Sequence, residues 1–337
     1  MTDFGLQLSQ RTPGSPHLRN TLSVDGILLT FVVLSLPCLL YGTWTFGVAR
    51  LGQEASLIPV LWSGLVQVGP RLLLLLGTAY ALARVNGLLR QQAIGLGWLP
   101  VAWFLVLLLP PDFSLLPAVL ALASAMVFGF FVFGGPGMAP FHTTILAMMF
   151  LTLAIGDPGL SVGLGESGST ASSWHLAVQG ELSAAGNPWV TGLPGALGAA
   201  SPGLILLSAV LLVALGQGSL RTLTAGIAGL LLGALSFAAI EGSDPLLGSW
   251  YGHLLVGNFV FVLVFIAMDP TCQALTRPGR WAAGFGFGFL VAAFRLVDST
   301  HPEGSIPALL LIYLCTPLMD AAVVRFYAWR RNRLEHG

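Results

Sequence analysis

The chain has 337 residues, of which 55% are hydrophobic and only 8% are charged, a composition typical of integral membrane proteins. Its 14 basic residues balance its 14 acidic residues, which argues against a nucleic-acid partner. The three cysteines, Cys38, Cys272 and Cys315, lie far apart and form no Cys-x-x-Cys pair. Neither a disulfide framework nor an iron–sulfur ligand set is therefore expected within this chain.

An N-terminal arm, residues 1–26, carries two arginines and two prolines and precedes the first long apolar run. Apolar runs long enough to cross a bilayer of ~30 Å then recur along the chain. The sequence predicts an all-α membrane protein of about ten transmembrane helices, with a membrane domain at 27–325 and a C-terminal tail at 326–337. The predicted spans are 27–46, 57–83, 95–110, 115–133, 142–156, 203–216, 223–240, 253–268, 281–297 and 305–325.

The arginines favour one orientation of these spans. With the N-terminus inside, eleven of the fourteen arginines fall on the cytoplasmic side, Arg50 falls outside, and Arg71 and Arg295 fall within spans. Arginine and lysine accumulate in cytoplasmic loops, so we expect both termini to be cytoplasmic in an inner-membrane protein. The long connection at 157–202 contains no arginine and is predicted to be periplasmic.

This connection contains a stretch of small and hydroxyl side chains at 165–174, with four serines and Thr170. A long polar connection must lie outside the hydrocarbon, because unpaired backbone groups are costly in lipid. Loops of this length usually carry function or are disordered. Two glycine-rich turns, at 134–137 and 284–288, hint at two halves of five helices each.

Several motifs in the C-terminal half occur in an order that resembles one protein family. They are Trp-Tyr-Gly-His-Leu (250–254), Gly-Asn-Phe-Val-Phe (257–261), Met-Asp-Pro (268–270), Thr-Arg-Pro-Gly-Arg-Trp (276–281), His-Pro-Glu-Gly (301–304) and Pro-Leu-Met-Asp (317–320). Together with the glycine turn at 133–138, they resemble the NqrB/RnfD family, which comprises the NqrB protein of the sodium-translocating NADH:quinone reductase and the RnfD protein of the Rnf electron-transport complex. The resemblance covers roughly residues 16–333.

The resemblance implies a membrane component of a multisubunit electron-transport complex, in the inverted five-helix repeats shared with urea transporters. Members of the family carry FMN through a phosphoester bond on the threonine of a periplasmic Ser-Gly-Ala-Thr motif. The matching residues here are Ser167, Gly168, Ser169 and Thr170. The resemblance further implies that a flavin transferase attaches the group, that other proteins of the complex oxidise the substrate, and that the assembly couples electron transfer to ion translocation.

Other positions depart from the family pattern. Leu164 stands where the attachment motif usually has an aspartate, and Ser169 replaces its alanine. The family has asparagines after the glycine turn, and residues 139–143 replace them here. The segment 90–97 aligns with a polar segment that the family has near its bound quinone, but it lacks that segment's glutamates. These departures argue against bound riboflavin or quinone on the cytoplasmic side. They leave open a channel or transporter of the same fold, or a membrane anchor without flavin.

Individual polar residues within or beside the spans have predicted roles. Arg71 must find a partner, since a lone charge in the bilayer costs ~3 kcal/mol, and it is a candidate cofactor ligand. Arg295 is expected to snorkel towards the end of its span, and His142 to lie at the interface. His253 and Asn258 are expected to bond between helices, and Asp269 to cap a helix end.

Overall fold

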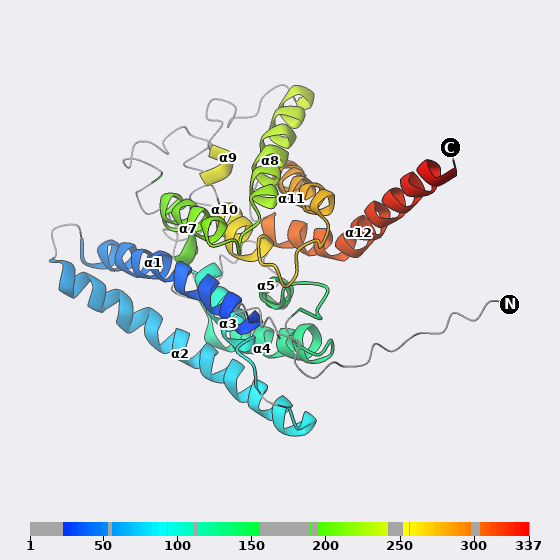
Figure 1. Ribbon diagram of the computed structural model, residues 1–337. Coiled ribbons are helices and arrows are strands. Elements are labelled where there is room, and N and C mark those ends of the chain that lie inside the picture. The colour runs from blue at the N-terminus through cyan, green and yellow to red at the C-terminus, as the bar shows by residue number, and fades with distance from the viewer. Residues whose placement is uncertain are drawn as a thin grey trace.

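The computed structural model describes residues 23–52, 56–92, 94–110, 113–135, 137–155, 189, 195–241, 252–255, 257–297 and 304–336. Within these ranges the regular structure is entirely helical (Figure 1). The N-terminal half contains α1 (Val24–Leu51), α2 (Leu57–Arg90), α3 (Trp98–Leu108), α4 (Leu115–Ala125), the π-helix η1 (Met126–Phe131) and α5 (Thr143–Ile155). The C-terminal half contains η3 (Leu197–Ala199), α7 (Pro202–Ala214), α8 (Leu220–Glu241), α9 (Gly252–Leu255), α10 (Phe259–Phe261), the π-helix η4 (Val262–Ala267), α11 (Arg277–Val297) and α12 (Ser305–His336).

Long apolar helices form the outside of the molecule. Helices α1, α2 and α12 are each long and apolar enough to cross a membrane. Much of α2 is exposed even at large apolar side chains, including Ile58, Leu73 and Leu89. Exposed apolar surface of this extent is expected of a helix that faces lipid. In Figure 1, α1 and α2 lie side by side at one edge, and α8 packs against α11 at the other.

Two short segments lie in the centre and are buried on all sides. In α3 every residue from Pro100 to Leu108 is buried, and in α10 and η4 so is every residue from Phe259 to Ala267. A helix that is apolar all round belongs in the interior. Figure 1 shows both segments between the outer helices, and η3 contacts the end of α3 through a hydrogen bond from the Leu197 amide to the Leu109 carbonyl (3.1 Å).

Glycines bring neighbouring helices into backbone contact. On α8, a Cβ atom added to Gly229 would collide with the carbonyl oxygen of Phe285 on α11. On α11, a Cβ atom added to Gly288 would collide with the carbonyl oxygen of Gly226 on α8. Small residues allow this approach, which matters in lipid because association there depends on close packing.

The two π-helices each precede a turn that leads to polar side chains, η1 at some distance and η4 almost directly. In η1, the Val132 amide bonds to the Val127 carbonyl at 3.1 Å, the wide spacing of a π turn. The Gly135 amide then closes the turn on the Phe130 carbonyl at 2.9 Å. Single π turns within helices are rare and are frequent at functional sites. His142 and Thr143 after η1, and the polar side chains of residues 268–276 after η4, are therefore candidates for a functional site.

Helix is present within each of the ten predicted spans. The predicted eighth span, 253–268, is divided into α9, α10 and η4, and Gly257 at the break adopts a φ of +72°. Helix α12 continues to His336, past residue 325, where the predicted tenth span ends, and that span boundary stays a prediction. The all-helical fold class is confirmed over the described residues, with long apolar helices outside and short ones inside. The count of ten spans and the inverted repeats stay predictions.

We expect Gly229→Leu to destabilise the protein by at least about 1–3 kcal/mol, because the larger side chain forces α8 away from α11. Gly77→Ala is the matched control, because Gly77 is exposed in α2 and has open space around its Cα. That control should leave stability unchanged or raise it by about 1 kcal/mol. Thermal unfolding of the purified protein in detergent measures both. Equal unfolding midpoints for the two variants would contradict the close contact of α8 with α11.

Candidate functional site

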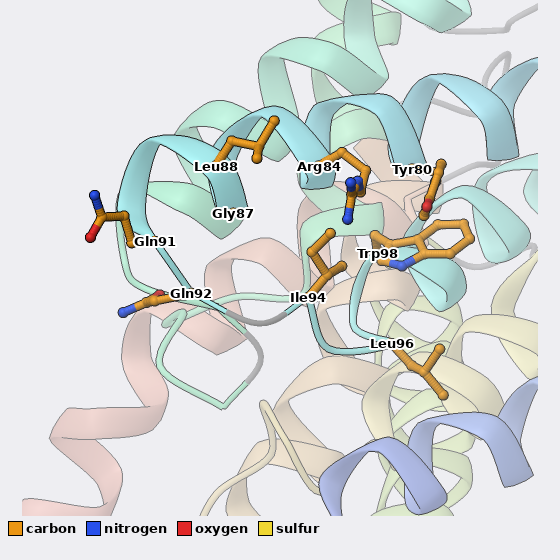
Figure 2. A pocket seen from close by; sticks show the side chains of 9 residues that line it. All are labelled: Tyr80, Arg84, Gly87, Leu88, Gln91, Gln92, Ile94, Leu96 and Trp98. Atoms are coloured by element: carbon orange, nitrogen blue, oxygen red, sulfur yellow. The ribbon is translucent and has the colours of Figure 1, made fainter.

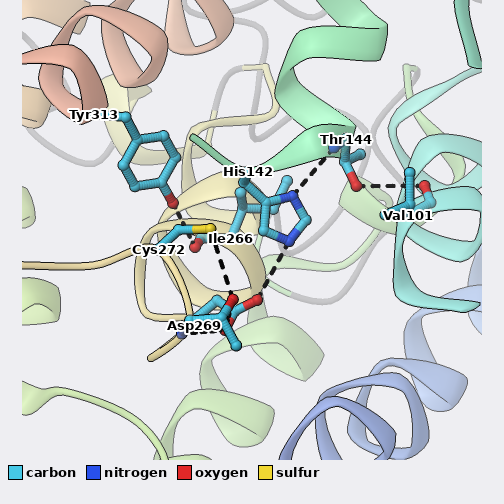
Figure 3. Close-up of polar contacts among 8 residues, drawn as sticks. Val101, His142, Thr144, Ile266, Asp269, Cys272 and Tyr313 are labelled. Atoms are coloured by element: carbon cyan, nitrogen blue, oxygen red, sulfur yellow. Dashed lines mark hydrogen bonds and ion pairs between the residues drawn. The ribbon is translucent and has the colours of Figure 1, made fainter. Parts of the chain in front are cut away.

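A histidine and an aspartate from opposite halves of the chain meet in the protein interior. His142 immediately precedes α5, and Asp269 follows η4. The His142 Nε2 atom lies 3.3 Å from Asp269 Oδ2, and the two residues are only 4% and 1% exposed. Figure 3 shows the pair between the start of α5 and the turn after η4. Polar groups buried this deeply require hydrogen-bond partners.

The surrounding hydrogen bonds assign the protons of this pair. The Thr144 amide donates to His142 Nδ1 at 3.2 Å, so that nitrogen accepts and the ring proton is on Nε2. The Nε2 atom then donates to the Asp269 carboxylate. The other carboxylate oxygen, Oδ1, accepts from both the amide and the hydroxyl of Thr271, each at 2.8 Å. Three donors thus surround a single buried carboxylate.

Further hydrogen bonds connect this cluster to four helices. The Tyr313 hydroxyl of α12 donates to the Ile266 carbonyl of η4 at 2.8 Å. The Thr144 hydroxyl of α5 donates to the Val101 carbonyl of α3 at 3.3 Å. Burial, followed by the nearby charge of Asp269, raises the pKa of the Cys272 thiol, so this cysteine is not a reactive thiolate. The cluster therefore joins the two halves, and its role among the described residues is structural.

The structure corrects two of the predicted roles. His142 was expected at the interface, but it is buried and bonded to Asp269. Arg295 was expected to snorkel, but it is 2% exposed, and its Nη1 donates to the His253 carbonyl of α9 at 2.5 Å. In both cases a polar group of another element supplies the partner in place of the membrane surface. His253 and Asn258 are buried, and Asp269 lies just after η4, where its side chain bonds Thr271 and His142, while Met268 is the residue that ends the helix.

Two of the family-like motifs meet at the start of α11. The Asp320 carboxylate of α12 accepts from the amides of Leu275 (2.8 Å) and Thr276 (3.0 Å) and from the Thr276 hydroxyl (2.5 Å). The Arg280 Nε atom donates to the Ala274 carbonyl at 2.9 Å. Both motifs therefore hold the turn before α11 in place, which is a structural role.

Among the predicted site residues, Arg71 lies within the described part of the chain. Its Nη1 donates to the Gln67 carbonyl at 2.8 Å, and its guanidinium lies 5.8 Å from the centroid of the Phe113 ring. Its Nε is buried and has no hydrogen-bond partner among the described residues. Ser167, Gly168, Ser169 and Thr170 lie outside the described residues. The arrangement at Arg71 leaves one donor for an anionic or carbonyl group.

A cavity of about 610 Å³ opens between the C-terminal half of α2 and the connector that leads into α3. Figure 2 shows Arg84 and Tyr80 on α2, facing Ile94 and Trp98 across this space. Pockets of this volume are large enough for small-molecule ligands. The connector wall of this cavity belongs to the segment 90–97, which the family resemblance aligns with a quinone region, whereas no motif indicated the wall from α2.

Comparison with known proteins identifies relatives along almost the whole chain. The profile of the NQR2, RnfD, RnfE family matches residues 11–327. The NqrB protein of the Na(+)-translocating NADH-quinone reductase of Stutzerimonas stutzeri is 26% identical over 359 residues, which cover 95% of this chain and 89% of that protein. The corresponding protein of Azotobacter vinelandii is 27% identical over 360 residues, with the same coverage of 95% and 89%.

We expect Asp269→Ala to destabilise the protein by about 3 kcal/mol, because it strands buried donors on His142 and Thr271. A double-mutant cycle with His142→Ala should give a coupling energy of about 1–3 kcal/mol. Thr224→Ala, at an exposed hydroxyl of α8, is the control and should change stability by less than about 0.5 kcal/mol. Denaturant unfolding in detergent measures the free energy of unfolding of the wild type, the two single variants, the double variant and the control. Additive effects of the two substitutions would show that the pair contributes no mutual stabilisation.

Proposed function

Because the chain belongs to the NQR2, RnfD, RnfE family, we propose that it is the membrane-embedded component of a multisubunit electron-transport complex. The family match over residues 11–327 carries this proposal, since it includes both halves of the chain. The relatives are named as parts of a Na(+)-translocating NADH-quinone reductase, and the chain covers 89% of their length. The apolar outer helices agree with a multi-pass membrane protein.

The proposed topology has ten spans in two inverted halves, with both termini in the cytoplasm. Two features of the structure support it. The third predicted span of each half is a segment buried on all sides, α3 in one half and α10 with η4 in the other. The next two elements pack against each other in both halves, α4 on α5 and α11 on α12. The concentration of arginines on one side supports the orientation.

The cofactor we propose is FMN, joined to Thr170 by a phosphoester bond that a flavin transferase forms. Thr170 would supply the hydroxyl oxygen, and Gly168 with its serine neighbours would supply space and backbone N–H donors to the phosphate. The bound flavin would supply the electron-transfer chemistry, while this chain binds and orients it. Other proteins of the complex would supply the substrate and any iron–sulfur centre, because the three cysteines here are far apart in the sequence.

Arg71 is the described residue that fits an anionic cofactor. Its buried Nε donor has no partner among the described residues, and its guanidinium lies beside Phe113 within a long apolar helix. A phosphate or a ring carbonyl would satisfy that donor. In this role Arg71 binds and positions the group, and it takes no part in proton transfer because an arginine does not lose its proton in proteins.

The packing of the centre favours a redox component over a channel for a polar solute. Phe104 of α3 lies 6.2 Å from Phe261 and 5.9 Å from Phe265, measured between ring centroids. Phe261 and Phe265 are 4.9 Å apart, and all three rings are almost completely buried. A channel for a polar solute needs polar groups along its path. The two central segments instead meet through closely packed rings.

The covalent flavin is tested on the purified chain, expressed beside a flavin transferase. We expect the peptide that contains Thr170 to carry the mass of FMN less one water, and the denatured chain to fluoresce under ultraviolet light on a gel. Thr170→Ala should abolish both signals, since it removes the attached hydroxyl. Flavin on neither Thr170 nor a nearby serine would contradict the cofactor proposal and favour a channel or an anchor.

Three further variants serve as controls for the attachment site. Ser167→Ala should keep the modification on Thr170, because the proposed bond lies on the fourth residue of the motif. Ser169→Ala restores the family residue and should retain or increase the modification. Leu164→Asp should increase the fraction of chain that carries flavin, if the transferase recognises an aspartate at this position. Modification that follows Ser169 instead of Thr170 would contradict the assignment of the bond to Thr170.

We expect Arg71→Leu to lower the amount of flavin-bearing protein that assembles into the complex, because it removes the donor to the bound group. Native gel electrophoresis measures assembly, and gel fluorescence measures flavin. Arg50→Leu is the control, since Arg50 is exposed beside Phe46. In the Thr170→Ala background, the effect of Arg71→Leu should disappear. An equal loss of assembly in that background would assign Arg71 to a protein partner.

A further inference from the structure

The cavity between α2 and the connector into α3 has a defined chemical character. Arg84 is the one charged residue among the described residues that line it. Figure 2 shows the Arg84 side chain directed from α2 towards Ile94 of the connector. Tyr80 and Trp98 close one end with an edge-to-face ring contact, their centroids 5.3 Å apart. The cavity therefore combines one positive charge with amphipathic aromatic rings.

The walls of this cavity are held in place by contacts on both sides. The Leu96 amide donates to Asp25 Oδ1 at the start of α1, at 2.9 Å. The Gln92 amide bonds to the Gly87 carbonyl at 3.0 Å, which closes the end of α2. A Cβ atom on Gly87 would lie 3.0 Å from Ile94, so the connector packs closely on the helix. The connector is thus tied to both α1 and α2, and the space is preformed.

The helix beside the cavity has the exposed apolar surface expected of a helix that faces lipid. Leu88 and Leu89, at the cavity and next to it, are 70% and 80% exposed, as expected for side chains against acyl chains. Tyrosine and tryptophan concentrate at the height of the lipid headgroups. Arg84 and Arg90 lie at the arginine-rich end of the spans, where anionic lipids attract basic residues. The cavity is therefore placed where a headgroup and its chains would meet the protein.

We propose that this cavity binds the phosphate of an acidic phospholipid. Arginine presents several N–H donors in a planar fork that matches phosphate oxygens. One guanidinium balances the single negative charge of a phosphodiester, and the exposed leucines continue the site towards the acyl chains. The shared chemistry is a phosphate group, which a lipid or a free phosphate ion could supply.

The test is native mass spectrometry of the full chain in detergent, with phosphatidylglycerol and phosphatidylcholine as competing lipids. We expect the wild-type chain to prefer phosphatidylglycerol. R84Q should weaken phosphatidylglycerol binding about tenfold, because a charge-assisted hydrogen bond is lost, and should weaken phosphatidylcholine binding less, because its choline cation already offsets the phosphate charge. R84K should retain most of the preference. R325Q is the control, since Arg325 is exposed on α12, and it should retain all of it.

Three results would overturn the proposal. The first is an unchanged lipid preference in R84Q, whose unfolding midpoint shows that it remains folded. The second is displacement of phosphatidylglycerol by inorganic phosphate at equal concentration, which would assign a site for the free ion. The third is displacement by a short-chain quinone, which would assign a site for an uncharged ring. Because none of these readouts uses flavin or electron transfer, the result is independent of the proposed redox function.

Discussion

The close approach of helix backbones is the constraint on which the rest of the structure depends. In lipid, apolar side chains gain little by leaving one apolar environment for another, so helices associate through packing. Glycine provides the required closeness in both halves. Gly229 and Gly288 join α8 to α11, and Gly47 and Gly64 place α1 in backbone contact with α2 at Val60 and Thr43. The helix pairs α1–α2 and α8–α11 enclose the centre of the molecule, and the short buried segments lie between them (Figure 1).

Between these helix pairs, polar side chains are buried at positions where their hydrogen bonds connect different elements. A buried carboxylate such as Asp269 is stable only if its oxygens are fully satisfied, and the three donors around it come from His142 and Thr271. Arg295 and Asp320 act in the same way on backbone groups of other elements. Each of these side chains forms hydrogen bonds with protein groups, which take the place of the water that would solvate it at the surface.

The sequence predicted the helices well because apolar length is a strong signal in membrane proteins. It predicted the polar contacts poorly. His142 and Arg295 were placed at or near the membrane surface, because their partners, Asp269 and the His253 carbonyl, are distant in sequence. The π-helix η4 was also missed, since a run that is apolar at every position carries no period from which its winding could be read. Of the candidate site, the motif around Thr170 came from family resemblance, whereas the partners of Arg71 required coordinates.

The cap on α11 has a consequence for how the protein is made. The Thr276 hydroxyl caps the Gly279 amide of α11, and the Asp320 carboxylate of a later helix in turn fixes the amides of Leu275 and Thr276 just before α11. A ribosome releases the chain from its N-terminus onwards, so α11 is synthesised before the side chain that completes its start. Until Asp320 emerges, those amides depend on water or on the insertion machinery. Helix α12 therefore completes the turn that leads into α11, and a chain released before residue 320 would lack that acceptor.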